Sequence, residues 1–218
     1  TIDDKTPTAA EEIWDGLDGA GSSATSVGGL VGTAGSTGVF NYVNTMGGVT
    51  FNGAARKGSG SANSDGASSG AGQGAWDFAL TTDGSALGVD GLAMGFGYGE
   101  AENGSATNAG GNEDSQHNTI FANYTYGPAT VGYQISELSA NTNGAAHENV
   151  DQWGIAFVVN ENLSISYGER EVEYDAPSAA NVTEDGEGIA IAYTMGSMKI
   201  AGNQNEVANN GGTTGTND

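Results

Sequence analysis

Alternation of apolar and polar residues is the dominant pattern of this chain. It is clearest from residue 117 to residue 137, HNTIFANYTYGPATVGYQISE, where two alternating segments flank a Gly127-Pro128 turn. A period of two predicts β-strands, so this stretch is predicted to form a hairpin. The apolar face of the hairpin carries Ile120, Ala122, Tyr124, Tyr126, Ala129, Val131, Tyr133 and Ile135. Phe121 breaks the alternation as an apolar residue in the polar phase.

The polar face of the hairpin is made of small or uncharged residues such as Thr130, Gly132, Gln134 and Ser136. Such residues suit a crowded or water-filled interior better than an open, solvated surface. On the apolar face, tyrosines lie near the turn and aliphatic residues lie further along. This order is expected when a turn lies at a membrane interface and the strand crosses hydrocarbon.

The same alternation predicts ten strands, at about 39–45, 49–56, 76–81, 92–99, 119–126, 129–136, 152–159, 163–174, 189–195 and 198–207. Their connections alternate in length. Short ones are expected at 46–48, 82–90, 127–128, 160–162 and 196–197, and the intervening loops are longer, polar and rich in glycine. Sorting of short and long connections to opposite ends of the strands is typical of outer-membrane barrels.

Composition excludes several classes of protein. The 218 residues include 38 glycines and no cysteine, and 27 acids against five bases give a formal net charge of −22. No apolar run approaches the roughly 18 to 20 residues of a membrane helix. The acidic balance argues against a nucleic-acid partner, because phosphate contacts need Lys and Arg. The absence of cysteine fits an oxidising compartment.

Residues 1–36 differ from the rest of the chain. The first part holds six acids and one base, and a run of Gly, Ser, Thr and Ala follows. Thr8, with Glu11 three residues later, is a helix-start signal and predicts a short helix from about Thr8 to Trp14 inside a long loop. A frayed tail is the alternative interpretation. The first ten residues have no basic end followed by an apolar segment, so we expect a mature protein or a piece of one.

No catalytic pattern is present in the sequence. His117 and His147 lie among polar residues at predicted loop ends, and neither a GxSxG elbow nor an HExxH helix occurs. The chain is therefore predicted not to be an enzyme and to need no cofactor. Clustered loop carboxylates could hold Ca²⁺, although no EF-hand loop is present, and the sequence leaves the question of a metal open.

Four stretches carry a resemblance to a known family: PTAAEEIWDGLDG from Pro7, YGPATVGYQISELSA from Tyr126, NENLSISYGEREVEY from Asn160 and YTMGSMKIAGNQNEV from Tyr193. With them the chain resembles the general diffusion porins of Gram-negative outer membranes, in particular those of marine alphaproteobacteria. The resemblance implies an all-β, transmembrane antiparallel β-barrel of sixteen strands. In such porins three barrels associate, and the third outside loop folds inward to narrow the pore.

The resemblance also assigns the parts of the chain. Residues 1–36 would be the inward-folded constriction loop, and residues 37–218 would supply about strands six to fifteen. Five strands before the chain and one after it are expected to complete the barrel, because open sheet edges in lipid leave backbone groups unsatisfied. The resemblance further implies a homotrimer in the outer membrane, in contact with lipid and lipopolysaccharide, through which ions and small hydrophilic solutes diffuse passively.

Two groups of candidate functional residues follow. The first would line the pore constriction: the loop acids Glu11, Glu12, Asp15 and Asp18, opposed by Arg56 and Arg170 in the polar strand phase. Solvated surface charges are the alternative, and Lys199 is expected at a periplasmic rim. The second group would form aromatic girdles at the membrane interfaces: Trp76, Tyr98, Tyr124, Tyr126, Tyr133, Trp153 and Tyr193. Their alternative role is in the core of a β-sandwich.

The sequence therefore predicts a water-filled channel that is weakly selective for cations, because acids are in excess in its loops and lumen. The alternative is a secreted acidic β-rich surface-layer protein or adhesin that binds calcium. Solubility separates these two hypotheses, since a porin needs detergent and a surface-layer protein is extracted into buffer by a chelator. The preferred solute, conductance and gating are not encoded in any motif of the chain.

Overall fold

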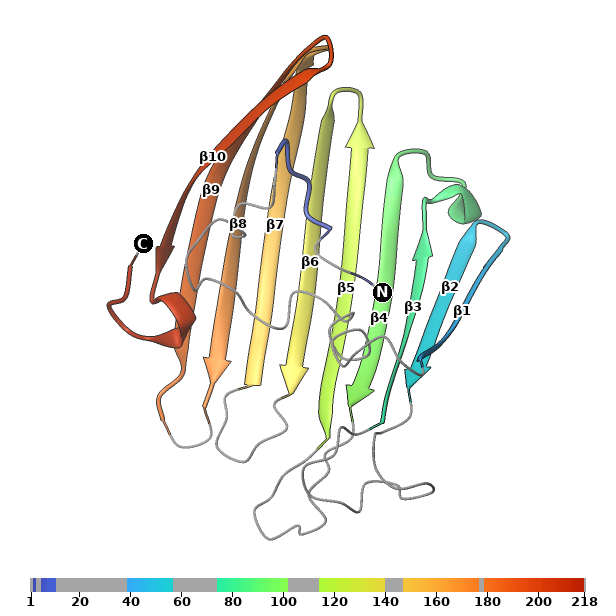
Figure 1. Cartoon of the computed structure of the whole chain (residues 1–218), viewed down its shortest axis with the longest axis vertical. Helices are drawn as coiled ribbons and strands as arrows, with labels where there is room; N and C mark the ends of the chain where they lie inside the picture. The colour runs from blue at the N-terminus through green and yellow to red at the C-terminus, as the bar shows by residue number, and fades with distance from the viewer. Residues whose placement is uncertain are drawn as a thin grey trace, which may run out of the picture.

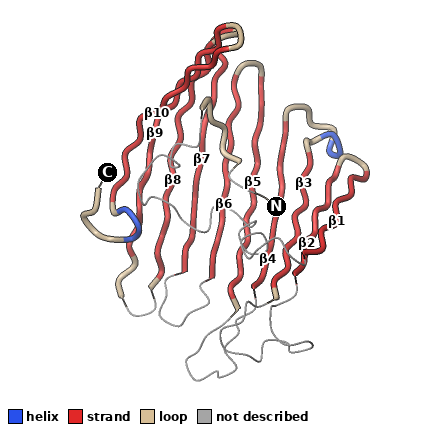
Figure 2. The backbone as a smooth tube through the Cα atoms, viewed as in Figure 1, coloured by secondary structure: helices blue, strands red, loops and turns tan. Residues whose placement is uncertain are grey.

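The computed structural model describes residues 2, 5–10, 39–56, 74–101, 114–139, 147–176 and 179–217. These residues form one sheet of ten antiparallel strands (Figures 1 and 2). The strands are β1 (Val39–Met46), β2 (Val49–Arg56), β3 (Ala75–Thr82), β4 (Leu92–Ala101), β5 (Ser115–Tyr126), β6 (Ala129–Ser139), β7 (His147–Asn160), β8 (Leu163–Asp175), β9 (Val182–Met195) and β10 (Met198–Ala208). All ten predicted strands are confirmed, several of them longer than predicted.

Each strand pairs with its neighbour in the chain, so the order in the sheet is β1 to β10 without a crossover. The sheet is curved, and β1 and β10 form its two edges within the described residues (Figure 1). The register is regular, and the one irregularity among the described pairs lies between Val158 and Asn160 of β7. An uninterrupted up-and-down order with a consistent register keeps one phase of every strand on one face of the sheet.

Short connections gather at one end of the strands, as predicted. The hairpins of β5 with β6 and of β9 with β10 turn through Gly127 and Gly196, whose φ angles are 58° and 61°. Two-residue hairpin turns need such positive φ angles, which glycine adopts without strain. The ends of β2, β4, β6 and β8, which lead into the longer connections, lie at the opposite end (Figure 1).

The connection between β3 and β4 contains a 3₁₀ turn, η2 (Ser85–Leu87), that the sequence analysis did not predict. The Ser85 backbone N–H donates to Asp83 Oδ1 at 3.0 Å. Hydrogen bonds from the hydroxyl and the N–H of Ser85 lower the pKa of the Asp83 carboxyl below its usual range. The Asp83 carboxyl therefore accepts a hydrogen bond at the start of this turn.

The two faces of the sheet differ sharply. In β9, Ile189 and Ile191 are 54% and 51% exposed, whereas Ala190 and Ala192 are 1% and 6% exposed. The face with exposed apolar residues is called the outer face. It carries Phe96, Ile120, Tyr124, Val131, Ile135, Ile155, Phe157, Ile165, Tyr193 and Ile200, each more than a third exposed. No layer of described residues packs against this face, which leaves a continuous apolar band around the sheet.

The opposite, inner face holds the buried residues, and most of them are small or polar. Its hydrophobic clusters are small: Ile2 packs with Ala79 and Phe121, and Val150 packs with Val172 beside Leu138 and Tyr174. The first cluster explains the exceptional phase of Phe121, because its ring is buried on the inner face against Ile2. Within the described ranges, no helix is long and apolar enough to cross a membrane.

Only the first three residues of the predicted helix are described, and the predicted boundary at residue 36 lies outside the described residues. Thr8, Ala9 and Ala10 are irregular, and the remainder of the expected helix lies outside the described residues. The glycine and serine run up to residue 36 also lies outside them. The division of the chain into a loop at 1–36 and strands at 37–218 therefore stays a prediction.

Candidate channel wall

Four glycines form a track across the inner face. Gly132 of β6 pairs with Gly154 of β7, Gly154 pairs with Gly168 of β8, and Gly168 pairs with Gly188 of β9. They share the phase of the buried residues, so they lie side by side on the inner face across four strands. Because these glycines have no side chains, another segment can approach the backbone closely along this glycine track.

The segment 5–10 lies on the inner face over this track (Figure 1). A Cβ placed on Gly132 would overlap the Pro7 ring, and one placed on Gly154 would lie 3.0 Å from the Pro7 carbonyl oxygen. Alanine at either position would therefore press against the segment. The glycine track and the segment 5–10 fit each other, and the fit depends on the missing Cβ atoms.

Side chains of the wall bind the backbone of this segment. Gln134 Oε1 accepts the Lys5 N–H at 2.8 Å, and Asn123 Nδ2 donates to the Lys5 carbonyl at 2.6 Å. Two strands away from β6, Ser166 Oγ accepts the Ala9 N–H at 2.9 Å. A chain segment that crosses a sheet needs partners for its backbone groups, and the inner face supplies them from β5, β6 and β8.

Beside this segment the wall carries a buried network of uncharged polar groups. The hydroxyls of Thr119 and Ser136 lie 2.7 Å apart, and Gln134 Nε2 donates to Thr119 Oγ1 at 3.2 Å. His117 and Gln152 are also buried in this phase of their strands. His117, which was predicted at a loop end, lies inside strand β5 instead, because that strand begins at Ser115.

The two arginines predicted to line the pore lie on the inner face, as their phase required. Arg170 is 2% exposed, and its Nη2 lies 2.5 Å from Glu184 Oε1, so its charge is paired within the wall. Arg56 is half-buried at the end of β2, six strands away from β8 in the sheet order. Lys199 lies exposed in the inner phase beside the Gly196-Ser197 turn. Glu11, Glu12, Asp15 and Asp18 lie outside the described residues.

All seven aromatic residues predicted for the girdles point to the outer face. Trp76 and Tyr98 are on the part of the strands toward the long connections, Tyr124, Tyr126 and Tyr193 are near the short turns, and Trp153 lies in the middle of β7 opposite Tyr133. Tyr133, in the first half of β6, lies between its Val131 and Ile135 neighbours on the same face. Because no layer of described residues packs against the outer face, these aromatic residues are not in the core of a β-sandwich within the described part of the chain.

Several of these aromatic groups donate hydrogen bonds to carboxylates of the outer face. Trp153 Nε1 donates to Glu169 Oε2 at 3.1 Å, Tyr98 donates to Glu100 at 3.3 Å, and Tyr133 donates to Asp151. Sequence reasoning missed Tyr167, whose hydroxyl lies 2.6 Å from both Glu169 Oε1 and Glu187 Oε2. Its apolar phase in β8 and the Glu two residues later were the available signal. An apolar ring with a polar tip suits a membrane interface.

Beyond the aromatic residues, the outer face becomes acidic toward the long connections. This acidic rim consists of Glu100, Glu137, Asp151, Glu169, Glu171, Glu173, Asp175, Asp185, Glu187 and Glu206. The change from apolar to acidic along a single strand marks where hydrocarbon ends. Among the described residues, no group of three His, Asp or Glu side chains is arranged to hold a metal ion.

Comparisons with known proteins connect this geometry to a class of fold. No family model and no curated protein matches the sequence. Among solved structures, OmpT, an outer membrane protein of Vibrio cholerae, matches in its trimer form with a TM-score of 0.59 at 14% identity, covering 92% of this chain and 61% of that chain. A second in-vitro folded OmpT structure gives 0.56 at 13% identity, covering 78% of this chain and 53% of that one.

OmpF of Salmonella typhi, in a complex with daunomycin, gives a TM-score of 0.54 at 10% identity, again covering 78% of this chain and 53% of the other. The chain thus spans little more than half the length of the structures it matches. At these identities the comparisons bear on the fold, which is the porin-like fold of an outer-membrane β-barrel. Together with the exposed apolar band, this fold places the chain in the outer membrane.

Proposed function

We propose that this chain is part of a trimeric general diffusion porin, whose water-filled channel lets ions and small hydrophilic solutes cross the outer membrane passively. The observation that carries the proposal is the division of one sheet into two faces, with exposed aliphatic residues outside and a small, polar wall inside. A soluble surface-layer protein would have to expose the same apolar band to water, which disfavours that alternative.

The proposed barrel has sixteen strands, of which the described sheet supplies ten. Strands β1 and β10 would pair with further strands of the complete protein, because an unpaired edge in lipid leaves each backbone group unsatisfied at a cost of several kcal/mol. In this arrangement the short turns face the periplasm, and the acidic rim and long connections face the outside. Diffusion through such a channel requires neither a reaction nor a cofactor, and we assign no enzymatic activity to the chain.

The constriction is proposed to be formed by residues 1–36, which would fold into the lumen as an inward loop. The support for this is the segment 5–10, whose backbone binds Gln134, Asn123 and Ser166 of the inner face. The acids Glu11, Glu12, Asp15 and Asp18 follow directly after this segment in the chain and would bring negative charge into the channel. Arg56 would oppose them from β2, while Arg170 is already neutralised by Glu184.

We propose weak cation selectivity on the basis of these acids and of the net charge of −22. The described part of the inner wall contributes little to this selectivity, because its acidic and basic residues are equal in number. The acids are Asp77, Glu148 and Glu184, and the bases are Arg56, Arg170 and Lys199. Selectivity should therefore come chiefly from the loop acids and fade when they are neutralised.

The test is reconstitution of the full-length protein into planar bilayers and liposomes. The proposal expects stepwise ohmic conductance, swelling of liposomes in small sugars, and a reversal potential under a salt gradient that indicates cation preference. Absence of conductance from a correctly inserted, heat-resistant oligomer would refute the channel. Anion preference would refute only the selectivity.

A further inference from the structure

A second segment of the chain also folds onto the inner face. After β10 ends at Ala208, the backbone takes a left-handed conformation at Asn209, with φ 55°, and continues into the 3₁₀ turn η3 (Asn210–Gly212). The segment closes on itself, because the Asn210 N–H donates to the Thr216 carbonyl at 2.8 Å and the Gly215 N–H donates to Asn209 Oδ1 at 2.9 Å. It is a compact unit, which we call the mouth segment (209–217).

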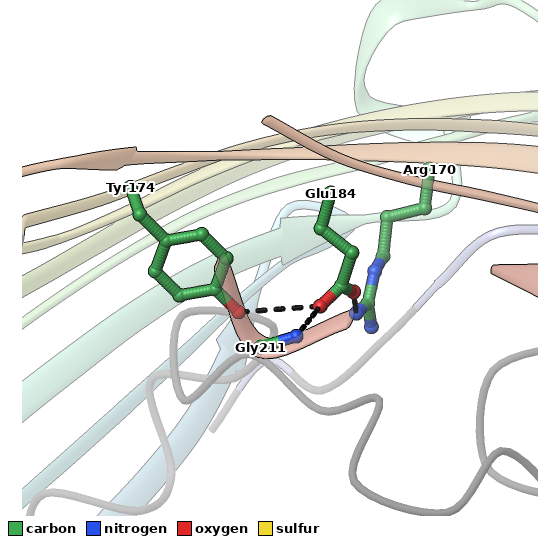
Figure 3. Close-up of polar contacts among 4 residues, drawn as sticks. All are labelled: Arg170, Tyr174, Glu184 and Gly211. Atoms are coloured by element: carbon green, nitrogen blue, oxygen red, sulfur yellow. Dashed lines mark hydrogen bonds and ion pairs between the residues drawn. The ribbon is translucent and has the colours of Figure 1, made fainter. Parts of the chain in front are cut away.

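The mouth segment is attached to β8 and β9 through described contacts. Asn209 Nδ2 donates to the Thr183 carbonyl at 2.9 Å, and the Gly211 N–H donates to Glu184 Oε2 at 2.8 Å. Gly212 lies flat against the ring of Tyr174, so that a Cβ at Gly212 would lie 2.7 Å from a ring carbon. Figure 3 shows Tyr174, Glu184 and Arg170 pointing from the sheet toward Gly211.

Glu184 is the centre of this attachment. Its side chain is fully buried, and its two oxygens have different partners: Oε1 binds Arg170 Nη2 at 2.5 Å, whereas Oε2 accepts from Gly211 N at 2.8 Å and from Tyr174 Oη at 3.4 Å (Figure 3). An ion pair that served only to join β8 and β9 would not need the second oxygen to face a backbone N–H of the mouth segment. Arg170 orients the carboxylate, and the carboxylate holds the segment.

The mouth segment and the segment 5–10 lie at different levels of the wall. Along β8, Ser166 contacts the segment 5–10 and the Tyr174 ring contacts Gly212 of the mouth segment, a separation of eight residues or about 26 Å along the strand. At the level of Tyr174 the outer face carries Glu171 and Glu173 of the acidic rim, outside the apolar band. The mouth segment therefore lies at the end of the wall that leads to the long connections.

We propose that Glu184 is a positioning residue that fastens the mouth segment to the channel wall, and that this fastening sets the size limit for solutes at the outer entrance of the channel. The proposal rests on the channel function proposed above. It adds a second narrowing, separate from the constriction formed by residues 1–36. A released segment would leave the wall, and the entrance would admit larger solutes.

The first test is Glu184→Gln in the full-length trimer, with Asp185→Asn as the matched control. Asp185 is the next residue in β9, carries the same charge, and points to the opposite face. Liposome swelling in raffinose relative to arabinose should rise at least about twofold in the Glu184 variant and stay at the wild-type value in the control. The conductance of both variants is measured in 1 M salt, because the electrostatic effect of the lost carboxylate is then screened beyond about 3 Å.

Glu184→Gln also leaves Arg170 with a weaker partner and could impair folding, so a second variant leaves the ion pair intact. Asn209→Gly removes the Asn209 contacts with Thr183 and Gly215 while tolerating the positive φ angle. It should raise the raffinose to arabinose ratio in the same direction as Glu184→Gln. A rise larger than the rise in Glu184→Gln would overturn the proposal, because it would make Asn209 and not Glu184 the residue that fastens the segment.

A disulfide lock separates release of the segment from loss of a wall charge. The sequence has no cysteine, and a Cβ on Gly212 would lie 3.3 Å from the Tyr174 Cβ, close to the separation that a disulfide spans. The reference protein is the double variant Tyr174→Cys, Gly212→Cys in its oxidised form. When Glu184→Gln is added to this double variant, oxidation should return the swelling ratio to the reference value. Reduction of the disulfide should raise the ratio again.

An increased ratio that persists once the disulfide has formed would overturn the proposal. An unchanged ratio in Glu184→Gln would do the same. These outcomes differ from failure of the proposed function, in which the wild-type protein itself gives no conductance and no swelling.

Discussion

Placing a methyl group on the glycine track should displace the segment 5–10 from the inner wall. In Gly132→Ala the new Cβ would overlap both the Pro7 ring and Asn123 Oδ1. The Asn123 amide is also the donor to the Lys5 carbonyl at 2.6 Å. Relief of the overlap therefore moves the segment or turns the amide, and either change breaks this hydrogen bond.

The size of the effect follows from what is lost. A hydrogen bond of this kind contributes about 0.5 to 1.5 kcal/mol net, and about 1.4 kcal/mol changes an equilibrium tenfold. The bonds of Lys5 N to Gln134 and of Ala9 N to Ser166 remain. The fraction of time in which the segment 5–10 leaves the wall should accordingly rise by up to about tenfold.

The assay is single-channel recording of the full-length protein, which counts excursions to a higher conductance level. Two further glycines provide a graded series. Gly154→Ala, whose Cβ would lie 3.0 Å from the Pro7 carbonyl oxygen, should have a smaller effect, and Gly202→Ala, which meets nothing within 4 Å, should have none. Equal traces from Gly132→Ala and Gly202→Ala, in oligomers of equal heat resistance, would refute the reasoning.

Three other predictions concern single side chains. Ile191→Arg places a charge on the lipid face and should lower the free energy of unfolding in vesicles by about 2 to 4 kcal/mol. Its control, Ala201→Arg in the exposed inner phase, should leave the free energy of unfolding near the wild-type value. Equal losses in the two variants would contradict the assignment of faces. Ser166→Ala removes the acceptor of the Ala9 N–H and should raise open-channel noise without changing the urea midpoint. Val172→Ala, in the buried cluster with Val150, should cost about 2 kcal/mol in the same unfolding assay, and a cost below the assay error would show that this cluster is not packed.

The alternation in the sequence was sufficient to predict the sheet. In every strand, side chains face lipid and lumen alternately. The apolar Ile189 therefore identifies the lipid face and the small Ala190 identifies the lumen face before any contact is known. Turn chemistry located the short connections, since glycine at Gly127 and Gly196 fits their positive φ angles. Phe121 departs from the pattern because its ring packs against Ile2, which comes from the N-terminal end of the chain, far from Phe121 in the sequence.

Features that depend on register between strands were beyond sequence reasoning. The glycine track exists only because Gly132, Gly154, Gly168 and Gly188 align across four strands, and each alone is an unremarkable glycine in a strand. For the same reason Arg170 was predicted as a pore-lining charge, and its pairing with Glu184 was not foreseen. The contact of Glu184 with Gly211 depends on a turn that follows β10, which no local pattern of residues predicts.

The central claim is that one phase of each strand meets hydrocarbon and the other meets the aqueous lumen. The most direct test attaches nitroxide spin labels, one at a time, to engineered cysteines at residues 188 to 194 of β9 in the full-length protein in lipid vesicles. We predict that accessibility to oxygen peaks at 189, 191 and 193 and is low at 190 and 192, which are buried on the inner face, whereas position 194, exposed in the same phase, is accessible to a water-soluble nickel complex. Loss of this alternation, or the opposite phase, would contradict the account.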